Sequence, residues 1–169
     1  MQYRRARVQG GTYFFTVVAC NRQHIFAGKD NVDVLRRAFQ DVMENYPFRM
    51  DAHVILPDHL HCIWTLPDGD RDFSTRWRFI KSHFTRQYQH AVPGRSPWQK
   101  KFWEHVVRDE KDMGNHVDYI HYNPVKHGLV ESPVEWALSS IHRYINDGLY
   151  SRDWGASEPL SWDAGVGKE

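Results

Sequence analysis

Residues 48–67 read "FRMDAHVILPDHLHCIWTLP" and carry the strongest local signal in the chain. Two runs rich in apolar and β-branched residues stand on either side of a Pro-Asp pair, which is typical of a tight turn. The stretch therefore predicts a hairpin of two strands, with His59 at the start of the second arm. Because alternate side chains of a strand share a face, His59 and His61 should lie side by side on one surface of the sheet.

The histidine pair has two interpretations. Two imidazoles at this spacing can bind a metal ion, or they can be half-buried histidines with ordinary hydrogen bonds. The chain contains 11 histidines, so pairs also arise by chance. The spacing alone leaves both interpretations open, and the rest of the chain has to supply further ligands.

Two elements are predicted upstream of and beside the hairpin. The segment 12–20, "TYFFTVVAC", is continuously apolar and aromatic, which favours a strand buried on both faces. Apolar residues then recur at helical spacing through 32–46, with Asp30 or Asn31 as the predicted N-cap and Pro47 as the stop.

Three elements are predicted downstream of the hairpin. Helical spacing resumes at 73–88 with a basic face, and "KFWEHVVR" at 101–108 favours another strand. The acidic run 109–112 suits the start of a last helix, since carboxylates stabilise the positive end of the helix dipole. We expect this helix to end or kink at Asn123, because the residue before Pro124 disfavours the α conformation.

The predicted order of elements is β, α, β, β, α, β, α. This order indicates an α+β fold in which a ferredoxin-like antiparallel sheet (βαββαβ) carries two helices on one face. An additional C-terminal helix would then be free to cover the other face, above the histidine pair.

The composition indicates a folded chain. With 169 residues, 41% of them hydrophobic and 14% aromatic, the chain is long enough for one domain and too apolar for a disordered protein. Cys20 and Cys62 match no zinc or disulfide pattern and are interpreted as reduced core residues. No segment approaches the ~20 apolar residues of a membrane span, so we expect no membrane association and a cytoplasmic location.

The formal net charge of +1 is unevenly distributed. Between Arg71 and Arg108 there are nine Lys and Arg residues against two acidic residues, which favours either a polyanion-binding surface or a solvated helix face. Among the aromatic residues, Trp98 and Trp103 are candidates for stacking on nucleic-acid bases, whereas Trp77 lies on the apolar stripe of its helix and is predicted to be core.

The last predicted helix offers the second half of a site. Tyr119 and Asn123 stand at i, i+4, and an Asn at the end of a helix can present its carbonyl oxygen. Two imidazoles and one amide oxygen suit Mn²⁺ or Mg²⁺, although the imidazoles would also accept Zn²⁺. Taken singly, Asn123 could simply end the helix and Tyr119 could be a core aromatic residue.

Four segments together resemble the REP-associated tyrosine transposases, a branch of the HUH single-tyrosine transposase superfamily. They are "HLHCIWTLP" (59–67), "DFSTRWRFIKSHFTR" (72–86), "WQKKFWEHVVRDEKD" (98–112) and "HVDYIHYNPVKHGLV" (116–130). The resemblance runs from about Tyr13 to Tyr150. It implies a catalytic domain over residues 1–150 that nicks and rejoins single-stranded DNA at REP hairpins, followed by a tail, 151–169, whose structure is not predicted.

The resemblance also implies roles for individual residues. His59 and His61 match the metal pair, Asn123 matches the polar residue that completes the metal shell, and Tyr119 matches the nucleophile that forms a covalent 5′-phosphotyrosine. The implied cofactor is a divalent metal, Mg²⁺ or Mn²⁺. The basic side chains predicted to bind DNA are Arg4, Arg5, Arg78, Lys81, Arg86, Lys100, Lys101, Arg108 and Lys126.

Several questions stay open at this level. His116, Lys126 and His127 are all near Tyr119 in sequence and could help to deprotonate it, and none is preferred. A metal-dependent nuclease that uses water and a non-catalytic module that binds hairpin DNA or RNA are the alternative functions. The chain shows no dimerisation motif, so we expect a monomer rather than a homodimer.

Overall fold

The computed structural model describes residues 7–157, 159–167 and 169. Its strands are β1 (Thr12–Val18), β2 (Arg49–Ile55), β3 (His59–Thr65) and β4 (Trp103–Val106), and its helices are α1 (Lys29–Asn45), α2 (Phe73–Gln87), α3 (Glu110–Lys126) and α4 (Ile141–Asn146). Two short 3-10 helices cover Cys20–Arg22 and Pro133–Glu135. The order of the first seven regular elements confirms the predicted βαββαβ arrangement with an additional helix.

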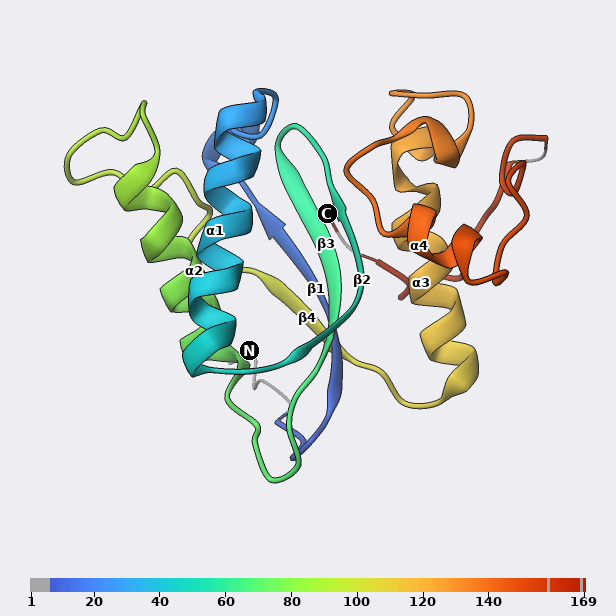
Figure 1. Cartoon of the computed structure of the whole chain (residues 1–169), viewed down its shortest axis with the longest axis horizontal. Coiled ribbons are helices and arrows are strands. Elements are labelled where there is room, and N and C mark those ends of the chain that lie inside the picture. Colours follow the sequence, from blue (N-terminus) through green and yellow to red (C-terminus); the bar gives the residue numbers. More distant parts are fainter. Residues whose placement is uncertain (1–6, 158, 168) are drawn as a thin grey trace.

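The four strands form one antiparallel sheet in the order β2-β3-β1-β4 (Figure 1). The predicted hairpin is present as β2 and β3, and β3 lies in the middle of the sheet. Along one row of the sheet, Trp103 on β4 pairs with Thr16 on β1, and Thr16 pairs with His61 on β3. This register brings residues from three strands beside the histidine pair.

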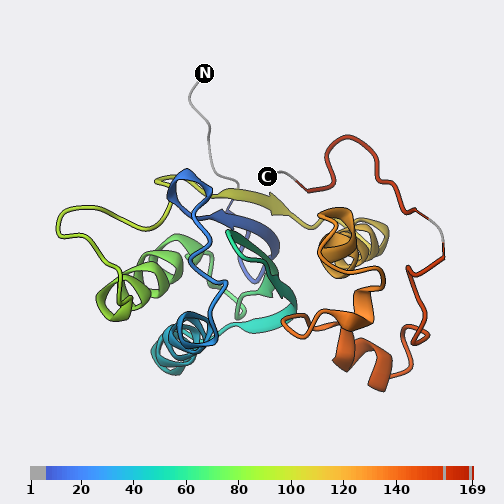
Figure 2. The same cartoon turned by 90° about the horizontal axis from the view of Figure 1, so that it is seen from above.

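Helices α1 and α2 cover one face of the sheet, where the larger apolar core lies (Figure 2). Even-numbered residues of β3, including Cys62 and Trp64, point into this core. Trp64 stacks on Trp77 with 4.5 Å between ring centroids, and both rings are fully buried. Large aromatic rings bury much apolar area at low entropy cost, so this stack fixes α2 on the sheet.

Helix α3 covers the opposite face, as expected (Figure 2). Phe14 and Ile63 of the sheet form a second, smaller core with Val117 and Ile120 of α3. Because the odd-numbered residues of β3 point to this side, the histidines face α3 and not the larger core.

Two predicted helix boundaries were wrong. Helix α1 begins after Gly28, with no side-chain cap, and Asp30 lies in its first turn rather than at the N-cap. Of the end or kink predicted at Asn123, the end is wrong, because α3 continues through Pro124 to Lys126. Backbone bonds from His127 N to Asn123 O (3.0 Å) and from Leu129 N to Pro124 O (2.9 Å) carry the chain past the proline.

Two further expectations need correction. The first strand is shorter than the segment 12–20, because it ends at Val18. Arg76, counted above with the basic surface, is 2% exposed. Its guanidinium donates to the carboxylate of Asp70 (2.7 Å) and to the carbonyls of Asp72 (2.8 Å), Pro47 (2.8 Å) and Tyr46 (3.1 Å). Arg76 is therefore a buried link between the end of α1 and the start of α2.

The segment after α4 returns across α3 (Figure 1). The ring of Trp162 lies 5.5 Å from that of Tyr119 and 5.4 Å from that of Tyr122, measured between centroids. Within the described part of the chain, no helix has the length and apolar character needed to cross a bilayer.

Candidate active site

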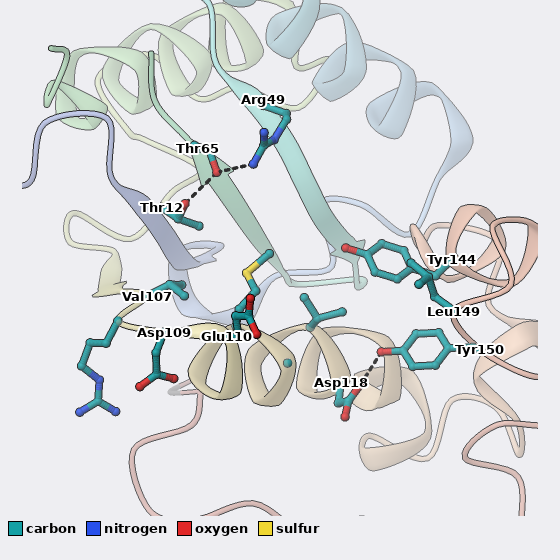
Figure 3. A pocket seen from close by; sticks show the side chains of 14 residues that line it. Thr12, Arg49, Thr65, Val107, Asp109, Glu110, Asp118, Tyr144, Leu149 and Tyr150 are labelled. Atoms are coloured by element: carbon teal, nitrogen blue, oxygen red, sulfur yellow. Dashed lines mark hydrogen bonds between the residues drawn. The ribbon is translucent and has the colours of Figure 1, made fainter. Parts of the chain in front are cut away.

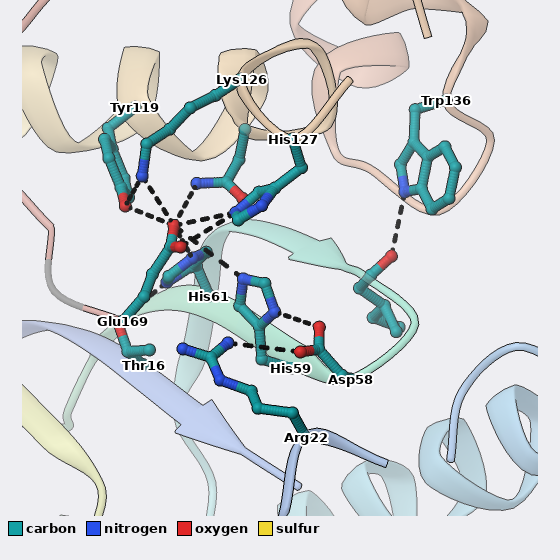
Figure 4. Close-up of polar contacts among 12 residues, drawn as sticks. Thr16, Arg22, Asp58, His59, His61, Tyr119, Lys126, His127, Trp136 and Glu169 are labelled. Atoms are coloured by element: carbon teal, nitrogen blue, oxygen red, sulfur yellow. Dashed lines mark hydrogen bonds and ion pairs between the residues drawn. The ribbon is translucent and has the colours of Figure 1, made fainter. Parts of the chain in front are cut away.

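His59 and His61 lie together on the α3 side of β3, as the alternation of a strand requires (Figure 4). Their ring centroids are 4.9 Å apart, and the two side chains are 1% and 0% exposed. Two imidazoles thus share a buried position at the start of a central strand.

The Nδ1 atom of each ring lies within hydrogen-bond distance of a neighbouring side chain. His59 Nδ1 lies 2.6 Å from Asp58 Oδ1, and His61 Nδ1 lies 2.8 Å from Thr16 Oγ1. Arg22 donates to the other oxygen of Asp58 at 3.3 Å. An ionised carboxylate only accepts, so His59 carries its proton on Nδ1 and leaves a lone pair on Nε2.

Both imidazoles are kept neutral. Burial lowers the pKa of His59 and lowers that of His61 to about 4, because the charged form loses its hydration. At neutral pH the pair therefore consists of uncharged imidazoles, the protonation state in which histidine binds metals.

Tyr119 and Asn123 extend from α3 toward the histidines. The i, i+4 spacing places them on one stripe of the helix, and the Tyr119 ring lies edge-on to His61 with 5.4 Å between centroids. Both side chains are buried, at 4% and 0% exposed. The structure thus brings together all four residues that the sequence singled out, from two elements far apart in the chain.

Glu169 occupies the middle of this group and was missed by the sequence analysis. Its Oε1 accepts from Tyr119 OH at 2.7 Å and from Asn123 Nδ2 at 3.2 Å (Figure 4). The same oxygen lies 3.6 Å from His61 Nε2 and 4.0 Å from His59 Nε2. Nothing in a weakly patterned tail marks this glutamate, so periodicity and spacing could not have found it.

Lys126 and His127 complete the surroundings of the carboxylate. Lys126 Nζ lies 3.0 Å from Glu169 Oε1 and 3.1 Å from the hydroxyl oxygen of Tyr119, and His127 Nε2 lies 3.0 Å from Glu169. Burial would raise the pKa of Glu169, but the donors around it, His127 first, lower it overall. Burial and then the carboxylate raise the pKa of Tyr119 above its ordinary value.

The donor atoms fit a divalent cation. His59 Nε2, His61 Nε2 and Asn123 Oδ1 are buried and have no hydrogen-bond partner among the described residues. Such orphaned polar atoms are costly unless a ligand satisfies them. Neutral imidazole nitrogens and an amide oxygen are suitable ligands for Mn²⁺ or Mg²⁺, and Glu169 adds a carboxylate within reach of both histidines.

A second group of His105, Asp112 and His116 also has metal-ligating atoms close together. Most of its polar atoms are already paired, because His105 Nε2 lies 2.8 Å from Asp112 Oδ2 and His116 Nδ1 lies 2.8 Å from the Asp112 carbonyl, whereas His116 Nε2 is buried without a hydrogen-bond partner among the described residues. The two imidazole rings are stacked at 19°, with 4.5 Å between their centroids. This group links β4 to α3.

The predicted DNA contacts that the structure describes come from several elements, among them α2, α3 and the segments that flank β4. Arg4 and Arg5 lie outside the described residues. Lys81 is half-buried and donates to the Gln99 carbonyl at 3.1 Å. Trp98, a predicted stacking residue, is 3% exposed and belongs to the larger core, so that prediction was wrong. The exposed members of the predicted set are Arg78, Arg86, Lys100, Lys101, Arg108 and Lys126.

A separate hollow of about 570 Å³ lies at the other end of β3, beside the start of α3 (Figure 3). Of the predicted site residues that the structure describes, only Arg108 lines it. Its polar groups largely satisfy one another: Thr12 bonds Thr65 at 2.8 Å, and Tyr150 donates to Asp118. The hollow therefore has no evident connection to the histidine and tyrosine group.

Comparisons with known proteins agree on one family. The sequence profile described as "Transposase IS200 like" matches residues 7–123. The chain is 47% identical over 164 residues to the REP-associated tyrosine transposase of Escherichia coli K12, covering 97% of this chain and 96% of that protein. A solved structure described as a REP-associated tyrosine transposase bound to a REP hairpin superposes with a TM-score of 0.86 at 44% identity, covering 100% of this chain and 98% of that one.

Proposed function

The chain belongs to the family of IS200-like transposases, and from that premise we propose that it cuts and rejoins single-stranded DNA through a covalent bond to Tyr119. It is a tyrosine transposase, and it is 47% identical in sequence to a REP-associated member of that family. We propose further that its substrates are REP-type hairpins, because the solved relative of 44% identity is described as bound to one.

One observation carries the assignment of the nucleophile. The Tyr119 hydroxyl and two imidazole nitrogens that have no hydrogen-bond partner among the described residues converge on a single carboxylate oxygen, at 2.7, 3.6 and 4.0 Å. A tyrosine with only a packing role in the core would not need its hydroxyl to contact the same carboxylate as two potential metal ligands. The contact supports a phenol that acts on a phosphate beside a metal ion.

His59, His61 and Asn123 would hold a divalent cation through Nε2, Nε2 and Oδ1. When bound, such a cation supplies positive charge that stabilises the phosphate oxygens as negative charge develops on them. Asp58 and Thr16 orient the two imidazoles toward it.

The proposed reaction exchanges one phosphoester for another. The phenol oxygen of Tyr119 bonds to phosphorus, the bond from phosphorus to the 3′-oxygen breaks, and the phenolic proton is given up while the departing oxygen takes one. The products are a 5′-phosphotyrosine and a free 3′-hydroxyl. A 3′-hydroxyl can later attack the phosphotyrosine and rejoin the strand, which hydrolysis by water would not permit.

Substrate access requires a change at the site. Tyr119 is 4% exposed, and Trp162 packs against its ring while Glu169 takes its hydroxyl hydrogen bond. A DNA strand can therefore reach the phenol only after the segment from Trp162 to Glu169 has moved away.

The proposal is tested with a REP-type hairpin oligonucleotide, Mn²⁺ and denaturing electrophoresis. The wild type should form a covalent protein–DNA adduct, Tyr119→Phe should form none, and EDTA should abolish the adduct. Tyr122→Phe is the matched control, since it removes a hydroxyl from the same helix and should leave the adduct unchanged.

Other results would support the rival functions. Cleavage that survives in Tyr119→Phe without an adduct would indicate a nuclease that uses water. Salt-sensitive binding of the hairpin with no cleavage and no effect of metal would indicate a binding module. An adduct that persists in Tyr119→Phe would show that another residue is the nucleophile.

A further inference from the structure

An anion already occupies the space between the nucleophile and the metal-type ligands. The Glu169 carboxylate receives hydrogen bonds from Tyr119 and Asn123 and lies 3.0 Å from both Lys126 Nζ and His127 Nε2 (Figure 4). A carboxylate and the non-bridging oxygens of a phosphodiester present a similar arrangement of negative oxygens to such donors. The carboxylate therefore indicates where a phosphate would bind.

Lys126 is the one cation in this group that contacts both the anion and the nucleophile. Its Nζ lies 3.1 Å from the Tyr119 oxygen and 3.0 Å from Glu169 Oε1. It also lies over the Tyr119 ring, 5.1 Å from the centroid. Its side chain is 42% exposed, so an approaching strand of DNA can reach it.

The continuation of α3 past Pro124 accounts for this position. Tyr119, Asn123 and Lys126 stand at i, i+4 and i+7, which is one stripe of an α-helix. A helix that ended at Asn123 would leave Lys126 without a fixed direction. The extra turn returns its side chain to the face that carries Tyr119.

We propose that Lys126 is a catalytic residue that, together with His127, binds the scissile phosphate where the Glu169 carboxylate now lies. This inference rests on the proposed function and assigns the scissile phosphate, rather than the DNA backbone in general, to Lys126. In this role Lys126 acts through the positive charge of its ammonium group. Its charge stabilises the phenolate character of Tyr119 and the negative charge on the phosphate oxygens as the new bond forms.

The kinetic test uses a Glu169→Gln background, so that loss of the lysine–glutamate contact cannot be mistaken for loss of a phosphate contact. At saturating hairpin DNA and Mn²⁺, Lys126→Met should slow single-turnover adduct formation by about 100-fold or more. The dissociation constant for DNA should change by about fivefold or less, which is the effect of one exposed ionic contact. Lys126→Arg, which keeps the charge, should recover part of the rate.

Lys111→Met is the matched control. It removes the same charge from an exposed position near the start of α3, away from Tyr119, and should leave the rate unchanged. His127→Ala should also slow adduct formation, as Lys126→Met does.

A second measurement needs neither metal nor turnover. In EDTA, the Glu169→Gln protein should bind an oligonucleotide with an ordinary scissile phosphate more tightly than one with a neutral methylphosphonate at that position. Adding Lys126→Met should remove most of this difference in affinity, because the ammonium group that interacts with the charged phosphate is absent. Lys111→Met should leave the difference in place.

The outcomes separate the inference from the function on which it rests. If the wild type forms no adduct, the proposed function fails. If it forms one and Lys126→Met forms it at the same maximal rate, or loses only affinity for DNA, the lysine is an ordinary backbone contact and the inference is wrong. Equal discrimination against methylphosphonate with and without Lys126 would also overturn it.

Discussion

Asp58 determines which nitrogen of His59 can bind a metal. The carboxylate accepts a hydrogen bond from His59 Nδ1 at 2.6 Å, and Arg22 donates to its other oxygen. Burial alone would raise the pKa of Asp58, but the contacts with His59 and Arg22 lower it overall, so the carboxylate stays ionised. The sequence "PDH" shows that an aspartate precedes His59. The sequence does not show which atoms of the two side chains form a hydrogen bond.

We therefore expect Asp58→Ala to lower the affinity of the protein for Mn²⁺ by about 10–100-fold, the usual effect of removing a partner that orients a metal ligand. Isothermal titration calorimetry of the folded protein measures this. Asp153→Ala, which removes an exposed carboxylate remote in sequence from the site, should leave the affinity unchanged. Unchanged affinity in Asp58→Ala would mean that β3 alone orients the ring.

Gly167 is the residue that lets the chain pass directly over Tyr119. Its φ is +68°, and a Cβ built there would lie 2.2 Å from Cζ of the Tyr119 ring. No side chain fits that space. We expect Gly167→Ala to displace the segment that carries Glu169 and to increase the rate of adduct formation.

Gly165→Ala is the control for Gly167→Ala. Gly165 also has a positive φ, +127°, but a Cβ there would meet nothing within 4 Å. A change at Gly165 thus adds backbone strain without a clash. Rates measured by denaturing electrophoresis should rise only for Gly167→Ala, and an equal effect of both changes would attribute the result to strain in the segment.

At the scale of elements, periodicity predicted the types of the strands and helices well. The alternation in 48–67 and the helical spacing of 32–46 arise because one face of each element is buried. Burial therefore produces a periodic pattern of apolar residues that can be recognised in the local sequence. The faces of His61 and Trp77 followed from the same rule.

The predicted end of α3 was wrong because the prediction used only the local effect of a proline on the preceding residue. It could not include the tertiary contacts that α3 makes. Pro124 removes one backbone donor and disfavours the helix at Asn123, which costs free energy locally. Pro124 and Asn123 are buried, and Lys126 and His127 bind Glu169, so packing and ion pairing outweigh that cost. Glu169 is 50 residues from Tyr119, a separation that no periodic pattern spans.

Arg76 is the connection between elements whose loss should cost the most. Its guanidinium satisfies the carbonyls of Tyr46, Pro47 and Asp72, and pairs with Asp70. Arg76→Met would fill a similar volume but leave those acceptors unpaired. We expect the free energy of unfolding to fall by about 3 kcal/mol.

Urea unfolding followed by tryptophan fluorescence measures this loss. Arg78→Met is the control, because Arg78 is exposed on the same helix and its replacement should change stability by about 0.5 kcal/mol or less. If Arg76→Met were as stable as Arg78→Met, the buried hydrogen bonds would be contributing nothing beyond packing.

On the scale of the whole molecule, the two faces of the sheet bury different kinds of side chain. The face under α1 and α2 is almost entirely apolar, whereas the face under α3 buries polar side chains, including His61, His116 and Asn123. His121 is also buried on the α3 side, whereas the half-buried His53 pairs with Cys62 of β3 and so faces the α1 side of the sheet. His121 Nε2 bonds Ser140 Oγ at 2.7 Å, and the backbone of His53 bonds the same serine.

These two histidines make stability depend on pH. Burial lowers the pKa of His53 to about 4 and that of His121 to about 3. The unfolded chain binds protons at these positions below about pH 6.5, while the folded chain does not until about pH 4 or lower. Their contribution is therefore fully present above pH 6.5 and is lost as pH falls toward the folded values.

Between pH 7 and pH 5 we expect each of the two to lower the free energy of unfolding by about 2 kcal/mol. Carboxylates titrate mostly below this window, so urea unfolding in EDTA at the two pH values isolates the histidines. His121→Gln, which can keep the bond to Ser140, should reduce the loss by about 2 kcal/mol, whereas a change at the exposed His24 should not. If stability were equal at pH 7 and pH 5, or if His121→Gln lost as much as the wild type, burial of neutral histidines would not govern the acid sensitivity of the fold.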